Sequence, residues 1–297
     1  MNIEPWKRMN LFKRRDPMRP DLASALDRLG GLGESDPSLR DAAVLQSAIL
    51  RAIYRSPPQI GPIELTADRA RAKLHSIPLL RGEHVPLDSV AIRSLMLDLC
   101  RAVRQSEAGS GAVNTIATAI EQGLLDVSAL VAAVLDGEAP AIREQAAALE
   151  IDGELLCTLL RFSLFPALEQ LAAQIAPLRT LAAWQPGYCP TCGSWPLLSE
   201  YRSLDQARFL RCGLCATEWP LDRLLCPFCG CRDHQQLGYL HVEGEQQPRA
   251  ATCTQCRCYN KALATLVPIP SIELAIDDLA TIHLDMIALE HGYLAPI

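Results

Sequence analysis

The residues of this sequence that are best placed to do chemistry are cysteines. The 297-residue chain contains 12 cysteines, and ten of them lie between residues 189 and 258. Two intervening residues in a Cys-x-x-Cys unit let the backbone form a tight turn, a knuckle, that directs both thiolates at one ion, and two knuckles complete a tetrahedron. Eight of the ten cysteines form four such units, which are Cys189/Cys192, Cys212/Cys215, Cys226/Cys229 and Cys253/Cys256. The sequence therefore predicts thiolate metal sites in this segment.

The gaps between the units indicate how they pair. Nineteen residues separate Cys192 from Cys212, and 23 separate Cys229 from Cys253, so each gap has room for a β-hairpin that returns the second knuckle to the first. The other gap, from the second unit to the third, is only ten residues long, which is typical of a linker. We expect two sequential tetrathiolate sites, each holding one mononuclear ion, and an interleaved, cross-braced pairing is the alternative.

The local sequence of the knuckles is typical of zinc ribbons and rubredoxin-type iron sites. Gly193 and Gly230 follow the second cysteine of a unit and Gly213 lies inside one, so each is expected to permit a positive φ near the sulfurs. Tetrahedra of thiolates bind zinc or iron, and the residues do not select between them. In either case we expect the ion to replace a hydrophobic core in each small module.

The remaining cysteines and two nearby histidines are open to simpler interpretations. Cys231 and Cys258 each lie two residues beyond a knuckle, which suits a small residue on the departing strand or, alternatively, ligand exchange or thiol redox chemistry at the second ion. His234 and His241 are expected to be exposed to solvent, with replacement ligands as the alternative. The two cysteines of the N-terminal part lie in apolar helical runs and are expected to pack in a core; they are Cys100 and Cys157.

The elements that must position these residues change in character near Trp184. Residues 1–183 have helical periodicity and are expected to form an all-α domain, with a basic arm at residues 1–20. Helices are expected near residues 39–53, 88–99, 112–122, 127–135, 140–149 and 154–178, the last kinked or split at Pro166. Turn residues and short β-prone runs then replace the helical pattern, until an apolar stripe returns with Ile272, Ile276, Leu279, Ile282, Met286 and Leu289.

These patterns predict an α+β multidomain fold. The helical domain is followed by two four-cysteine, zinc-ribbon or rubredoxin-like modules at residues 184–224 and 225–268. A C-terminal amphipathic, acidic helix closes the chain at 269–297. This last segment has no Lys or Arg but contains Asp277, Asp278 and Asp285, which we expect to form either a solvated face or a dock for a basic peptide.

Composition and missing motifs exclude several functions. The net charge is -6, and residues 184–268 carry eight Lys and Arg against seven Asp and Glu, which disfavours a zinc-ribbon nucleic-acid-binding protein. The chain has no phosphate-binding loop, zinc-protease or serine-hydrolase motif, and a site closed by four thiolates has no open position for substrate, so no enzyme is predicted. A thiol redox protein that uses its Cys-x-x-Cys pairs is the other alternative.

The sequence also indicates a compartment. No apolar signal region follows the basic start of the chain, and the longest apolar stretch, at residues 129–135, is far shorter than the about 20 residues that span a membrane. We therefore expect a cytoplasmic protein with no membrane span, in which cysteines bind metal and do not form structural disulfides.

The cysteine segment closely resembles one family, the formate dehydrogenase accessory proteins called FdhE. The resemblance covers residues 188–293, and its most diagnostic part is Cys212-x-x-Cys215-x-Thr-Glu-Trp219, which generic ribbons do not require. The other matching motifs are Tyr188-Cys-Pro-Thr-Cys-Gly-Ser194, Cys226-x-x-Cys229, Cys253-x-x-Cys256-x-x-Tyr259-x-Lys261, Asp277-Asp278-Leu-Ala280, Leu284-Asp285 and Glu290-x-Gly-Tyr293.

The resemblance implies a function as well as a metal. Members of this family act in the bacterial cytoplasm during maturation of respiratory formate dehydrogenase and contact its catalytic subunit before twin-arginine export. Their cysteines are associated with rubredoxin-like iron, so the resemblance favours iron over zinc, with a redox-sensitive proofreading role. It carries the ligand role onto Cys189, Cys192, Cys212, Cys215, Cys226, Cys229, Cys253 and Cys256, but not onto Cys231 or Cys258. If the partner presents an arginine-rich export signal, Asp277, Asp278 and Asp285 are expected to supply complementary charge.

Overall fold

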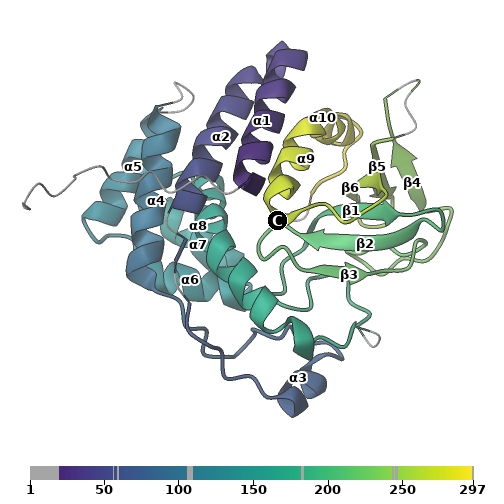
Figure 1. Ribbon diagram of the computed structural model, residues 1–297, viewed down its shortest axis with the longest axis horizontal. Coiled ribbons are helices and arrows are strands. Elements are labelled where there is room, and N and C mark those ends of the chain that lie inside the picture. Colours follow the sequence, from purple (N-terminus) through teal and green to yellow (C-terminus); the bar gives the residue numbers. More distant parts are fainter. Residues whose placement is uncertain are drawn as a thin grey trace, which may run out of the picture.

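The N-terminal part of the chain is a group of helices that lies beside a six-stranded sheet (Figure 1). The computed structural model describes residues 20–55, 57–58, 60–105, 110–181, 184–242, 244 and 247–295, so the predicted basic arm lies outside the described residues except for Pro20. The helices of this part are α1 (Pro20–Ser35), α2 (Arg40–Arg55), α3 (Ala67–Lys73), α4 (Ser89–Arg104), α5 (Ser110–Glu121), α6 (Val127–Asp136), α7 (Ala139–Ala148) and α8 (Gly153–Gln174). Short 3-10 turns occur at Pro37–Leu39 and Ala176–Leu178.

Aspartates at the starts of the helices explain where several of them begin. Asp88 accepts hydrogen bonds from two backbone N–H groups of the first turn of α4, and Asp126 and Asp152 do the same for α6 and α8. Each carboxylate satisfies donors that have no partner within the helix. The helices expected from residue 39 to residue 178 are all present, although α8 runs unbroken through Pro166, where a kink or split was expected.

Helix α8 forms the centre of the helical part. Among the described residues it is the one helix that is long and apolar enough, by length and composition, to cross a membrane, and 61% of its apolar window is buried. It packs against α2, α4, α5, α6 and α7. The apolar character of α8 is therefore accounted for by its position in the core of the helical part.

The two cysteine-rich segments share one sheet. Its strands are β1 (Pro196–Arg202), β2 (Ala207–Cys212), β3 (Glu218–Pro220), β4 (Leu237–Leu240), β5 (Arg249–Cys253) and β6 (Cys258–Thr265). The strand order is β3-β2-β1-β6-β5-β4, so each segment contributes three antiparallel strands, and β1 pairs in parallel with β6 between them. The two predicted modules are thus joined edge to edge, and the domain boundaries at residues 183, 224 and 268 stay a prediction.

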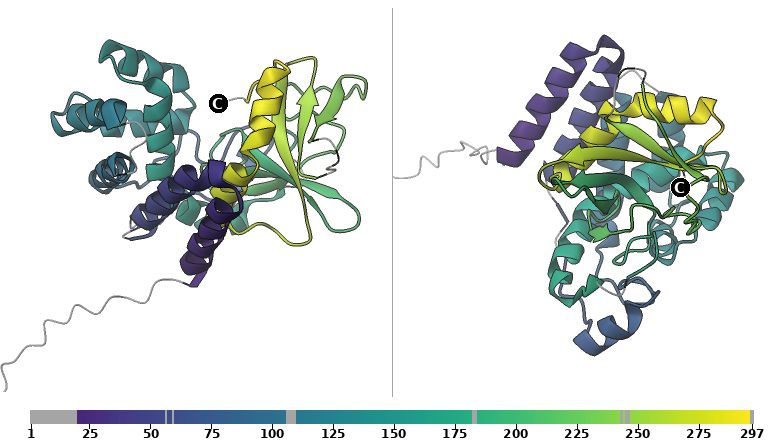
Figure 2. Two further views of the ribbon diagram at one scale, coloured as in Figure 1. Left: turned by 90° about the horizontal axis from the view of Figure 1, so that it is seen from above. Right: turned by 90° about the vertical axis from the view of Figure 1, so that its right-hand side faces the viewer.

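The C-terminal segment forms two helices where one was expected. After a 3-10 turn at Ser271–Glu273, α9 (Leu274–Ala280) and α10 (Ile282–Glu290) are separated by Thr281, which has φ −110° and ψ 20°. Because of this break, the apolar residues before and after Thr281 do not form one buried face. Ile272 and Ile276 are buried, whereas Ile282, Met286 and Leu289 are exposed. Figure 2 shows both helices lying between the N-terminal helices and the sheet, and α10 buries Leu284 and Ala288 against the sheet residues Ala250 and Tyr259.

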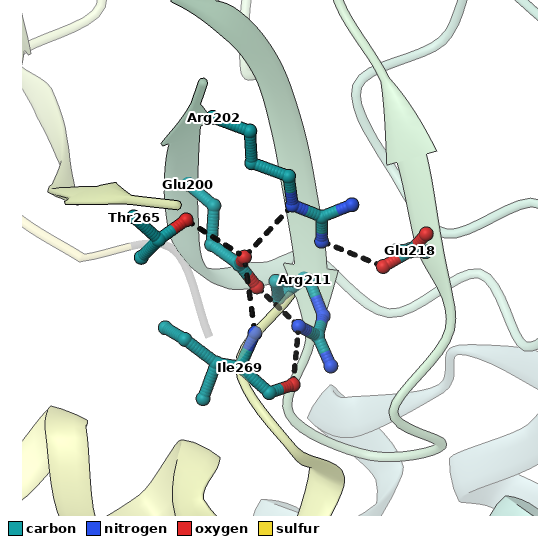
Figure 3. A network of polar contacts seen from close by, with 6 residues as sticks. All are labelled: Glu200, Arg202, Arg211, Glu218, Thr265 and Ile269. Atoms are coloured by element: carbon teal, nitrogen blue, oxygen red, sulfur yellow. Dashed lines mark hydrogen bonds and ion pairs between the residues drawn. The ribbon is translucent and has the colours of Figure 1, made fainter. Parts of the chain in front are cut away.

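A buried ion-pair network fixes the sheet to the segment that precedes α9 (Figure 3). Glu200 on β1 is fully buried, and its carboxylate pairs with Arg211 of β2 and, at 2.9 Å, with Arg202. The same carboxylate accepts a hydrogen bond from the backbone N–H of Ile269 at 3.2 Å, and Arg211 donates to the Ile269 carbonyl at 2.7 Å. The remaining members of the network are Thr265 and Glu218. A charge buried this deeply is tolerated only because it has several partners.

Candidate metal centres

The eight predicted ligands come together in two groups of four. In site 1 the Sγ atoms of Cys189 and Cys215 lie 3.6 Å apart, and those of Cys192 and Cys212 lie 3.4 Å apart. In site 2 the two corresponding distances, Cys226 to Cys256 and Cys229 to Cys253, are both 3.7 Å. Within each site all four sulfurs lie within 4.8 Å of one another. The pairing is therefore sequential and not interleaved.

These sulfur distances fit a tetrahedron around one ion. A metal–sulfur bond of about 2.3 Å places the sulfurs of a tetrahedral site about 3.8 Å apart, whereas a disulfide bond is about 2.05 Å long. All twelve cysteines are free thiols, and the short sulfur contacts join cysteines of different knuckles. The donor set and the spacing thus fit a closed mononuclear zinc or iron site in each group, and they do not select between the two metals.

All four knuckles have the same backbone conformation. The residue after the second cysteine has a positive φ, and its N–H donates to the carbonyl of the first cysteine at 2.9 to 3.1 Å. These residues are Gly193 (φ 83°), Ala216 (φ 57°), Gly230 (φ 72°) and Arg257 (φ 58°). Gly213, which was expected to serve the same purpose, has no positive φ; a Cβ there would lie 3.0 Å from the Leu197 Cβ, so its role is close packing.

The knuckle repeat also explains the two additional cysteines of site 2. In three of the four knuckles, the N–H of the first cysteine donates a 2.9 Å hydrogen bond to the carbonyl of the residue two positions beyond the second cysteine. In the fourth knuckle the two corresponding residues, Cys253 and Cys258, lie opposite each other in the register of β5 and β6. Those positions are occupied by Ser194, Thr217, Cys231 and Cys258. Site 2 therefore has thiols where site 1 has hydroxyls. Cys258 is the first residue of β6, as the simpler interpretation predicts, whereas Cys231 lies outside the strands, because β4 begins only at Leu237.

We expect the variants Cys231→Ser and Cys258→Ser to retain two ions per chain, because site 1 places hydroxyls at the equivalent positions. The expected change in the free energy of unfolding is below about 1 kcal/mol. Metal per chain, measured by mass spectrometry after anaerobic purification, checks this expectation, with Cys229→Ser as the control that loses one ion. Loss of an ion from either serine variant would show that these thiols are ligands.

Site 1 is buried where the helical part meets the sheet. Its four cysteines are between 0% and 3% exposed and belong to the main hydrophobic core. The backbone N–H groups of Leu79 and Leu80 donate to the carbonyls of Pro190 and Thr191, at 2.8 and 2.9 Å, so the segment after α3 holds the first knuckle. Arg179 donates to the Thr217 hydroxyl at 2.9 Å beside the second knuckle. We expected the ion to replace a hydrophobic core in a small module. Site 1 is instead part of the hydrophobic core that the helices form.

Site 2 is more open. Cys229 is exposed, Cys256 is partly exposed, and the buried residues around the site form a small separate group. The two sites are linked by ring contacts, since Phe228 of site 2 lies 5.6 Å from Trp195 beside site 1. A Cβ at Gly187, just before site 1, would overlap the Pro227 carbonyl, so the backbones also touch here.

Each group of thiols contains one with enhanced acidity. Burial alone would raise the pKa of Cys212, but hydrogen bonds from the other three thiols and from the Leu214 N–H lower it well below its ordinary value. Burial would also raise the pKa of Cys253, but hydrogen bonds, mainly from backbone N–H groups of the knuckle, lower it below its ordinary value. Burial raises the pKa of Cys226 to about 12. Metal binding at both sites must therefore displace protons, and affinity should fall as the pH falls.

The predicted packing cysteines lie away from both sites. Cys100 is fully buried and Cys157 is 8% exposed, and burial raises the pKa of both thiols, that of Cys100 to about 11. His234 and His241 belong to neither group of four. Sequence reasoning missed the positive φ at Ala216 and Arg257, for which the only signal is their place in the repeat.

The three acidic residues that were predicted to meet a partner are paired within the chain. Asp277 is 7% exposed and forms an ion pair with Arg28 of α1. Asp278 and Asp285 both pair with Lys261, whose side chain is 4% exposed. A basic peptide could bind these carboxylates only by displacing cations that already compensate them, so the arrangement indicates a structural role.

The sequence and the fold both have known counterparts. The family model for the FdhE central domain matches residues 188–223, and that for the FdhE C-terminal domain matches residues 226–296. An FdhE homolog of Stutzerimonas stutzeri is 40% identical over 109 residues, which is 35% of this chain and 35% of the relative, so that alignment spans about a third of either protein. An FdhE homolog of an Enterobacter species is 29% identical over 296 residues, covering 96% of this chain and 85% of the relative.

The helical part is included in the structural likeness. The crystal structure of the FdhE protein from Pseudomonas aeruginosa has a TM-score of 0.60 to this structure at 24% sequence identity, and the match covers 92% of each chain. This similarity shows a shared fold over both the helices and the sheet. Two domain matches over the cysteine sites and a relative aligned along nearly the whole length thus make the chain similar to the FdhE proteins in both its helical part and its sheet.

Proposed function

We propose that this chain is an accessory protein of formate dehydrogenase that acts in the cytoplasm as a maturation chaperone and carries two tetrathiolate metal ions. The similarity to FdhE proteins supports the accessory role, and the observation that carries the proposal is the pair of four-cysteine groups, one within each of the two matched domains. A closed tetrathiolate site has no open coordination position, which supports a protein that binds its client and performs no catalysis of its own.

The proposed ions are iron, one in each site. Ferric iron held by four thiolates absorbs visible light through thiolate-to-iron charge transfer, whereas ferrous iron and zinc in such a site are nearly colourless. After anaerobic purification we therefore expect two irons per chain by mass spectrometry and a colour that develops on mild oxidation, and removal of one ligand from a site should halve that absorption. Two zinc ions per chain, with no colour after oxidation, would contradict this part of the proposal.

The proposed partner is the catalytic subunit of formate dehydrogenase, bound before its export by the twin-arginine route. The decisive experiment mixes the purified chain with purified catalytic subunit and measures complex formation by analytical ultracentrifugation. We expect a complex with the metal-loaded chain. A titration of free thiols on the same sample separates the thiol redox alternative, since closed sites leave the eight ligand cysteines unreactive. No complex together with many reactive thiols would favour thiol exchange chemistry.

A further inference from the structure

Two threonines form a hydrogen-bonded pair beside the ligands of site 1. Thr191 lies between the two cysteines of the first knuckle, and Thr217 lies two residues beyond Cys215, the last cysteine of the second knuckle. The two hydroxyl oxygens are 2.9 Å apart, and the Thr217 hydroxyl is also 3.2 Å from the Sγ atom of Cys215. Thr191 is fully buried and Thr217 is 3% exposed. The pair therefore connects the two knuckles of one site and contacts one of its ligands.

An arginine reaches this pair from the helical part. Arg179 follows the 3-10 turn at Ala176–Leu178, and its backbone N–H donates to the Ala176 carbonyl at 3.1 Å, which fixes the backbone where the side chain begins. One guanidinium nitrogen donates to the Thr217 hydroxyl at 2.9 Å and to the Thr191 hydroxyl at 3.4 Å. A positive charge thus lies one hydroxyl away from a metal ligand.

The hydrogen-bonding capacity of Thr217 is fully used while Cys215 is a thiol. A hydroxyl group has one hydrogen to donate and two lone pairs that accept. The Thr217 oxygen accepts from Arg179 and from the S–H group of Cys215, and its own O–H group donates to Thr191.

The same contacts also suit the thiolate that a metal ion requires. A bound ion displaces the thiol proton, so the Cys215 sulfur then accepts a hydrogen bond and no longer donates one. The Thr217 O–H group can turn to this sulfur, and the Thr191 O–H group can turn to donate to Thr217, while Arg179 continues to donate. Thr217 keeps three partners in either form, because the two hydroxyls reverse direction together.

The charge of Arg179 favours the thiolate form. Four thiolates around one divalent ion carry a net negative charge, and the ligands of site 1 are between 0% and 3% exposed, so water compensates little of it. A hydroxyl whose oxygen accepts from a cation is a stronger donor to an anion. The carboxylate of Glu218 is also within the electrostatic influence of Arg179, but it pairs with Arg202 at 2.6 Å.

The corresponding position of site 2 has a different side chain. Cys258 lies two residues beyond Cys256, as Thr217 lies beyond Cys215, and its thiol donates to the backbone carbonyl of Cys256 at 3.4 Å. A thiol is a weaker donor than a hydroxyl that an arginine polarises. The contacts of Arg179 and Thr217 thus distinguish two sites that have the same ligands.

We propose that Arg179 is a positioning residue for the ion of site 1 and that it acts on Cys215 through the hydroxyl of Thr217. In this relay the Thr217 hydroxyl donates to the thiolate, and the guanidinium group strengthens that donation and offsets part of the negative charge of the site. The proposal rests on the part of the proposed function that places an ion in site 1, and it holds for zinc as well as for iron.

The first measurement is how tightly site 1 holds its ion. Cys229→Ser is present in every protein, so that site 1 holds the remaining ion, and mass spectrometry after anaerobic reconstitution with ferrous iron verifies one iron per chain. In competition with a chelator, Thr217→Val, which keeps the shape of threonine without its hydroxyl, should bind iron about 10–100-fold more weakly. Arg179→Met should have a similar effect. Thr217→Ser, which keeps the hydroxyl, is the matched control and should bind iron about as tightly as the parent protein.

The reduction potential of the iron separates the relay from a purely structural role. Loss of a positive charge and of a hydrogen bond to sulfur disfavours the more negative ferrous state, so the potential should become more negative in Thr217→Val and in Arg179→Met. Arg179→Lys, which keeps the charge and a donor, should restore most of the potential. The double variant should shift the potential by less than the sum of the two single shifts, because both act on one sulfur.

Two results would overturn the relay while site 1 still holds its ion. One is an unchanged reduction potential in Thr217→Val or Arg179→Met, because a residue that only supports the fold lowers affinity without moving the potential. The other is equal affinity of Thr217→Val and Thr217→Ser. A parent protein that retains no iron or zinc in site 1 would instead contradict the proposed function, and the relay with it.

Discussion

Replacement of Cys212 by serine is expected to remove the ion of site 1 and to destabilise the whole protein, whereas Cys229→Ser should remove the ion of site 2 and leave the helices folded. The difference follows from location, because site 1 is part of the main hydrophobic core and site 2 is surrounded by its own small group of residues. A structural tetrathiolate ion contributes roughly 10–16 kcal/mol in small domains, which is comparable to the about 5–15 kcal/mol that stabilises a typical domain.

Thermal unfolding followed by helical circular dichroism, with metal counted per chain, measures this difference. We expect the Cys212→Ser protein to lose helical signal at a much lower temperature than the Cys229→Ser protein, each with one ion remaining. Cys258→Ser serves as the control for substitution of a thiol that holds no ion. Equal unfolding temperatures for the two ligand variants would show that the helices do not depend on site 1.

The second large effect is expected at Glu200. Glu200→Gln keeps the size of the side chain but leaves Arg211 buried without a carboxylate and Arg202 with only that of Glu218, and removal of one member of a buried ion pair costs about 3–5 kcal/mol. Glu218→Gln is the matched control, because Glu218 pairs with Arg202 from a side chain that is 42% exposed, and its loss should cost no more than about 1 kcal/mol.

Urea unfolding of the metal-loaded proteins gives the free energies for this comparison. Metal content should be unchanged in both variants, since neither glutamate contacts a thiolate in the structure. If Glu200→Gln is as stable as Glu218→Gln, the network would contribute only specificity of the fold and not stability.

The metal ligands could be predicted from the sequence because a knuckle is a local structure. The two residues between paired cysteines determine the turn, and the 19- and 23-residue gaps are long enough for the hairpins that bring the knuckles together. The helices that begin after Asp88, Asp126 and Asp152 were predictable for the same local reason, since a cap and an apolar stripe occur within a few residues of each other.

Features that depend on distant parts of the chain were not predictable in this way. Helix α1 was missed because Gly30, Gly31 and Gly33 weaken the helical pattern, and its contacts with α2 and α9 compensate for their cost. The pairing of the C-terminal carboxylates with Arg28 and Lys261 depends on how α9 and α10 lie against α1 and β6. The parallel contact of β1 with β6 joins residues about sixty positions apart, and no local pattern encodes it.

The position of β6 has a consequence for synthesis of the protein. This strand is the last of the six in the sequence but lies at the centre of the sheet, between β1 and β5. While the ribosome is still making residues 258–265, β1 has already emerged with one edge unpaired, and an unpaired edge invites association with other chains. Nascent or truncated chains that stop before Cys258 should therefore be the aggregation-prone species of this protein, even when the ligands of site 1 are complete.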